Sequence, residues 1–253
     1  MIEKELQKKE NPLFNLIFNI LFPVIILRNG SEWLTKLLLT LFGESWYNEA
    51  EIVNDIPSIV FLIALLFPLI YFFIDLQKTR NINFISIIGF VNVLLTGGIG
   101  VFGSRLGLSR NWFILKEGLL PMSIGVLLIF YARYKPKSFN SILLNNAIFD
   151  LKKIHGSLSD QGEHELDRST RTAGYHLIAG FFISSLIQFV LASFIVVSDP
   201  GDENFNKEVS TMTWVSYLAV MVPTMVVLGK GFWGLMNDIE RITKLDKEEF
   251  MKG

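Results

Sequence analysis

The sequence contains no cysteine and is poor in charged residues. Only 19 % of its 253 residues are Asp, Glu, Lys or Arg, against about 25 % in ordinary soluble domains. The absence of cysteine excludes a disulfide-stapled secreted domain, thiolate metal sites, iron–sulfur clusters and thiol catalysis. The 23 Lys and Arg are balanced by 24 Asp and Glu, which gives a net charge of −1. This balance excludes a basic nucleic-acid-binding protein, so no nucleic-acid partner is expected.

Apolar residues are abundant and are gathered in blocks. They make up 51 % of the chain, with 22 phenylalanines and a mean hydropathy of +0.42. A helix needs about 17–25 mostly apolar residues to cross the hydrocarbon core of a membrane. Six blocks meet or approach that length, and the first of them is the shortest. They predict membrane spans at about residues 12–28, 56–74, 84–102, 111–131, 176–197 and 214–236. We therefore expect an all-α integral membrane protein, a six-helix bundle forming a single membrane domain over residues 1–253.

The basic residues predict the orientation of these spans. The segments that would share one side with both termini hold 16 Lys and Arg, whereas the three opposite loops hold 5. Lys and Arg concentrate in cytoplasmic loops of membrane proteins. Both termini are therefore expected in the cytoplasm, together with a long insert at residues 132–175.

Two segments are amphipathic or apolar but do not qualify as spans. Residues 33–42 are too short to cross the membrane and predict either a helix in the outer interface or a shallow re-entrant element. In the insert, apolar residues recur every three or four positions between Phe139 and Leu158, which predicts an amphipathic cytoplasmic helix. That helix would lie along the inner leaflet or pack as a linker against the bundle.

Ionisable residues inside predicted spans are the main candidates for a functional site, because their burial in a membrane is costly. Lys116 and Glu117 are adjacent near the outer end of the fourth span. Adjacent helical side chains point about 100° apart, so each needs a partner on another helix or water. They would either line a polar cavity with Asn92 or lie at the interface, with Lys116 extending outward. Lys230, between glycines in the sixth span, is a further candidate for binding a substrate or ion.

Catalytic and metal-binding motifs are not apparent. The three histidines, at positions 155, 164 and 176, do not form an HExxH motif or an i,i+4 pair, and no phosphate-binding loop or nucleophile elbow is found. The sequence therefore predicts no catalytic residues, no metal site and no cofactor.

Several short motifs resemble one known family. They are FPVII at residues 22–26, DLQKTR at 75–80, Gly97-Gly98, NWFILK at 111–116 and YKPKSFN at 134–140. In order and spacing they are similar to the intracellular septation protein A family, also called YciB-like inner-membrane-spanning proteins, over roughly residues 12–145. The chain departs from the shorter members by residues 33–42 and by the insert around residues 142–172.

The resemblance implies a bacterial inner-membrane protein that supports cell-envelope integrity or division without catalytic activity. Its expected partners are the lipid bilayer, envelope-synthesis or division membrane proteins, and a second copy of the chain. The alternative is a transporter of a small solute or lipid that uses a polar site near Lys116 and Glu117. The family supplies no site residues to carry over.

Overall fold

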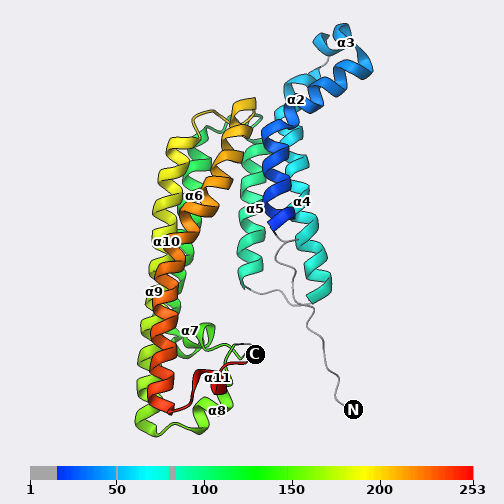
Figure 1. Cartoon of the computed structure of the whole chain (residues 1–253). Coiled ribbons are helices and arrows are strands. Elements are labelled where there is room, and N and C mark those ends of the chain that lie inside the picture. Colours follow the sequence, from blue (N-terminus) through cyan, green and yellow to red (C-terminus); the bar gives the residue numbers. More distant parts are fainter. Residues whose placement is uncertain (1–15, 50, 80–83, 147, 253) are drawn as a thin grey trace, which may run out of the picture. The chain divides into compact units, whose positions relative to one another are not determined.

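The computed structural model describes residues 16–49, 51–79, 84–146 and 148–252, and its regular elements there are helical (Figure 1). The predicted all-α fold is confirmed for these residues, where one isolated bridge, Phe149 to Met251, is the exception to helix. In chain order the elements are η1 (Ile17–Leu21), α2 (Phe22–Phe42), α3 (Glu44–Glu49), η2 (Glu51–Asp55), α4 (Ile56–Thr79), α5 (Phe84–Phe102), α6 (Arg110–Tyr134), α7 (Pro136–Leu143), α8 (Leu151–Gly156), α9 (Asp160–Ile195), α10 (Glu203–Thr243) and α11 (Lys247–Phe250).

Four helical segments are long and apolar enough to cross a membrane. They are Glu51–Ile74, Arg110–Tyr134, Asp160–Ile195 and Glu203–Thr243. Large apolar side chains on these helices remain exposed, such as Leu127, Leu186 and Val226, and extended apolar surface of this kind suits contact with lipid. In α5, the segment Phe90–Phe102 is apolar but shorter. The chain is thus a candidate integral membrane protein with several spans.

The first predicted span differs from the structure at its C-terminal end. Residues 12–15 lie outside the described residues, and the helix does not end near Arg28. Instead α2 continues to Phe42, so residues 33–42 are the second half of a longer helix and not a separate element. The i,i+4 pair of Glu32 and Lys36, 2.6 Å apart, supports the continuation, and the helix ends where Gly43 adopts φ +82°.

The predicted amphipathic helix at residues 139–158 is wrong in its continuity. The structure has two short helices, α7 and α8, with a turn between them. Asp150 caps α8 by accepting a hydrogen bond from the backbone N–H of Lys153, an interaction that starts a new helix. Phe139 and Ile154, from the predicted apolar face, are 1 % and 0 % exposed. These two side chains pack inside the protein, as expected from the alternative of a linker packed against the bundle.

The chain groups into two compact units. Unit 1 comprises residues 1–116 and 191–217, and unit 2 comprises residues 117–190 and 218–253. Because α6, α9 and α10 run past these boundaries, each of them contributes to both units. The single membrane domain predicted from the sequence stays a prediction.

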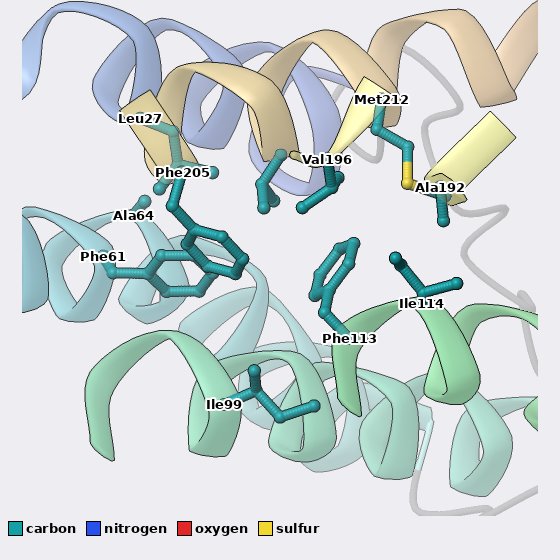
Figure 2. Packing of buried hydrophobic residues seen from close by; sticks show 11 residues of the cluster. Leu27, Phe61, Ala64, Ile99, Phe113, Ile114, Ala192, Val196, Phe205 and Met212 are labelled. Atoms are coloured by element: carbon teal, nitrogen blue, oxygen red, sulfur yellow. The ribbon is translucent and has the colours of Figure 1, made fainter. Parts of the chain in front are cut away.

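Unit 1 has an aromatic core, shown in Figure 2. The Phe205 ring of α10 packs on Phe61 of α4, with ring centroids 6.1 Å apart, and meets Phe113 of α6 edge-on at 5.6 Å. Buried polar groups add hydrogen bonds around this core: Asn206 donates to the carbonyl of Pro57 at 2.8 Å, and Ser210 to that of Val24 at 2.9 Å. These bonds satisfy groups that would otherwise be costly to bury.

Unit 2 gathers α7, α8 and α11 at one end of its portions of α9 and α10 (Figure 1). Its core is also apolar and includes Phe149, Ile154, Leu166, Ile239 and Phe250. The C-terminal segment is fastened to the insert by backbone hydrogen bonds from Asp150 to Phe250 and from Lys252 to Ile148, both 2.8 Å. The insert and the C-terminus therefore form one packed cap on the helices.

Candidate functional site

Lys116 lies inside unit 1, where α6 packs against α5. Its ammonium group donates to Oγ1 of Thr96 at 2.7 Å and to Oδ1 of Asn92 at 3.1 Å. The same ammonium lies 4.9 Å from the centroid of the Phe113 ring, within the range of a cation–π interaction. Lys116 is only 8 % exposed. The alternative in which it extends outward along the surface is therefore wrong.

The two acceptors come from one face of α5 because they are four residues apart. Thr96 is also hydrogen-bonded locally, since its hydroxyl donates to the carbonyl of Asn92 at 2.8 Å. The hydroxyl oxygen can therefore accept a hydrogen bond from Lys116 while the hydroxyl proton is donated to the carbonyl of Asn92. We call Lys116, Asn92 and Thr96 the α5–α6 polar cluster. The expectation that Lys116 finds a partner on another helix is confirmed, and Asn92 is that partner together with Thr96.

A buried ammonium group is expensive unless hydrogen bonds replace its water. In the α5–α6 polar cluster two neutral oxygens and an aromatic ring provide this replacement, which also ties two neighbouring helices together. Glu117, the next residue, is half-buried. A role for Lys116, Glu117 or Asn92 in binding a substrate or ion stays a prediction.

Lys230, the fourth candidate from the sequence, lies in unit 2 and far along the chain from the α5–α6 polar cluster. It lines a surface groove of about 510 Å³ between α9 and α10. The groove is rich in ionisable and polar side chains, and two glycines of α10 lie along it. Its lining residues are Glu165, Arg168, Ser169, Thr172, Ala173, His176, Lys230, Gly231, Gly234, Leu235, Asp238 and Arg241.

The charges of this α9–α10 groove are divided between its two ends. At one end Arg241 binds Glu165 at 3.3 Å and Asp238 at 3.2 Å, and Asp238 also accepts from Ser169. The hydrogen bond with Asp238, and then that with Glu165, raises the pKa of Arg241 above its ordinary value. At the other end His176 packs against Gly231, where an added Cβ would meet the His176 Cβ at 2.6 Å. The carboxylates are thus already engaged by Arg241.

The sequence alone did not reveal this groove. Arg168 and Arg241 are separated by 72 intervening residues, and only the antiparallel packing of α9 and α10 brings their segments together. A weak signal was available, because α9 and α10 carry polar turns directly next to their apolar blocks. Asn206 and Ser210 were missed in the same way, as polar residues in the first turns of a largely apolar helix.

Among the described residues, His, Asp and Glu side chains do not gather in groups of three or more that could hold a metal ion. The chain matches no protein-family model, no curated protein and no solved structure. The likeness to the intracellular septation protein A family therefore rests on the short motifs quoted above.

Proposed function

We propose that the chain is a six-span protein of the bacterial inner membrane, with both termini in the cytoplasm, that supports cell-envelope integrity or division. It acts through helix contacts with the bilayer and with other membrane proteins or a second copy of itself, and not by catalysis. The proposal is supported by the apolar helices, by the excess of basic residues on one side and by the family resemblance.

The α5–α6 polar cluster is the main structural observation in support of this proposal. The most conspicuous charge within an apolar helix, Lys116, makes hydrogen bonds with Asn92 and Thr96 and is buried. Helix-to-helix hydrogen bonds of this kind stabilise membrane bundles. A structural role accounts for the residue without a substrate.

The same cluster also favours the second candidate, a small-solute or lipid transporter. A buried ionisable group in a membrane span is a common component of a transport or proton pathway. In that function the charge of Lys116 would be indispensable, whereas in the structural function an apolar replacement of the whole cluster would serve equally well.

The test is complementation of a bacterial strain that lacks the gene, under osmotic shock and under cell-wall antibiotics. Wild type and the triple variant Lys116→Met/Asn92→Leu/Thr96→Val are expressed at equal levels in the membrane. We expect the deletion to sensitise the cells and both proteins to rescue them. A deletion without an envelope phenotype would contradict the proposed role, and failure of a stable triple variant would favour transport.

A further inference from the structure

Three basic residues follow one another closely where α6 passes into α7. We call Arg133, Lys135 and Lys137 the α6–α7 basic strip. All three side chains are exposed, and within the described part of the chain none of them is bonded to a carboxylate. Residues 118–149, which surround the strip, contain no Asp or Glu. The strip therefore carries three positive charges that its own segment does not balance.

The packing of α7 on α9 fixes the place of this strip. Phe139 of α7 is 1 % exposed, and Gly174 of α9 leaves room for its ring, since an added Cβ there would meet the ring itself. The next residue, Asn140, donates a hydrogen bond of 3.0 Å to the carboxylate of Asp167 on α9. Arg171 follows Asp167 by about one turn on the same face of α9. The contact with α9 therefore holds α7 in place without adding net negative charge beside the strip.

The same contact sets the depth of the strip relative to a membrane. Gly174, against which α7 packs, lies directly before the apolar block of α9 that begins at His176, and the strip directly follows the apolar block of α6 that ends at Tyr131. Tyr134 and Tyr175 lie beside these two ends and are 75 % and 55 % exposed. Tyrosine concentrates at the level of the lipid headgroups. Both helices therefore leave the hydrocarbon core where the strip lies.

An exposed face of α6 leads to the strip from the apolar side. Leu127 and Phe130 are 58 % and 54 % exposed, and Phe130 stacks on Tyr134 with ring centroids 6.2 Å apart and an interplanar angle of 8°. Spacings of three and four residues place these side chains on one face of the helix. This face passes from aliphatic to aromatic to basic side chains, which is the order of acyl chain, interface and headgroup in a phospholipid leaflet.

We infer that the α6–α7 basic strip docks on the anionic phospholipid headgroups of the leaflet that it faces and concentrates them beside α6. A leaflet presents many phosphates, so the three cations need only face one surface and need not converge on a single phosphate. Basic residues next to a membrane span attract anionic lipids in this way. The inference rests on the membrane spans of the proposed function but not on the role in the envelope. A measurement on purified, reconstituted protein therefore tests it separately from complementation.

Two lysines elsewhere in unit 2 provide a matched control for the strip. Lys152 and Lys244 are exposed and, like the strip, are not bonded to a carboxylate of the described residues. Lys244 is thirteen residues beyond Gly231, which packs on the start of the apolar block of α9, and this corresponds to about 20 Å along a helix. Lys152 lies on α8, which is near the last turns of α10, whereas α7 lies farther back along that helix (Figure 1). Both lysines are therefore farther from the membrane than the strip, and salt screens charges over about 10 Å.

The test measures which lipids gather beside the strip. Ser138 is exposed on α7, and a fluorophore on Ser138→Cys reports on its surroundings because the chain has no other cysteine. The labelled full-length protein is reconstituted in phosphatidylcholine bilayers, and its fluorescence is quenched by increasing fractions of doxyl-labelled phosphatidylglycerol or doxyl-labelled phosphatidylcholine. The ratio of the two fractions at half quenching gives the local preference for the anionic lipid.

We expect a preference of about tenfold for phosphatidylglycerol, since each basic residue near an anionic surface contributes about a factor of five. Lys135→Gln/Lys137→Gln should reduce the preference by about fivefold, whereas Lys152→Gln/Lys244→Gln, which removes the same charge, should keep it within about twofold of wild type. Equal quenching of wild type by the two lipids, or an equal loss in both double variants, would overturn the inference. Quenching by neither lipid would overturn it together with the spans of the proposed function. A clear preference in a protein that fails complementation would support the inference and contradict the envelope role alone.

Discussion

The ammonium group of Lys116 on α6 donates a hydrogen bond of 2.7 Å to the hydroxyl of Thr96 on α5. This contact joins residues twenty positions apart and, with Asn92, replaces the water that the buried charge has lost. The stability of unit 1 should therefore depend on the cluster as a whole and not on the charge alone.

Removal of both acceptors should be more harmful than removal of the whole cluster. Asn92→Leu/Thr96→Val takes both α5 oxygens from a buried ammonium and is expected to lower the free energy of unfolding by about 3–5 kcal/mol. Addition of Lys116→Met should recover most of this loss, because well-packed apolar groups can replace a buried polar network. Thermal unfolding of the detergent-solubilised protein, followed by tryptophan fluorescence, measures both effects. A triple variant less stable than the double variant would show that Lys116 is favourable by itself.

The side chain of Asn206 should contribute about 1–3 kcal/mol to the free energy of unfolding. It is 1 % exposed and donates to the carbonyl of Pro57 at 2.8 Å, so Asn206→Ala removes a hydrogen bond that joins α10 to α4. Asn204→Ala, two residues earlier at an exposed position, is the control and should change stability by less than about 0.5 kcal/mol. Chemical denaturation of the two variants compares them directly, and equal midpoints would contradict the assigned role of Asn206.

Phe250 should anchor the cap of unit 2. Its side chain is fully buried and stacks on Phe149, with ring centroids 6.3 Å apart. Phe250→Ala is expected to cost about 3–5 kcal/mol, as is usual for a phenylalanine removed from a core. The exposed Glu248 provides a control in Glu248→Ala. Limited proteolysis should cut the insert of the Phe250 variant faster, and unchanged protection would mean that the cap does not depend on this ring.

The helices were predictable from the sequence because long apolar blocks leave few other structures possible in a membrane. The spans at 111–131 and 214–236 fall within α6 and α10, and the span at 176–197 coincides with the C-terminal part of α9 except for its last two residues. The helix ends were less predictable, since α9 and α10 continue into polar turns that are stabilised by packing in the cap and by Arg241, not by lipid. Hydrophobic periodicity likewise missed the break between α7 and α8, because Asp150 starts a new helix there.

The candidate site was partly predictable. A lysine within an apolar block requires a partner. This reasoning identified Lys116 and named Asn92, but it did not place Thr96 with them. The α9–α10 groove was not predictable, because its residues come from the polar extensions of two helices and meet only through tertiary packing. Lys230 was the single groove residue that its position in a span made conspicuous.

The most direct test of the account is a measurement of the membrane topology. Because the chain contains no cysteine, each introduced cysteine is the single site that a maleimide can label. Single cysteines at Ser45, Ser104, Asn204, Ser157 and Lys252, and at Lys4 for the N-terminal side, are labelled in spheroplasts with a membrane-impermeant maleimide. Six spans with both termini inside predict labelling at Ser45, Ser104 and Asn204, and labelling at Lys4, Ser157 and Lys252 only after the membrane is permeabilised. Labelling of Lys4 in intact spheroplasts would remove the first span, and labelling of Ser157 together with Ser104 would contradict the membrane-spanning bundle itself.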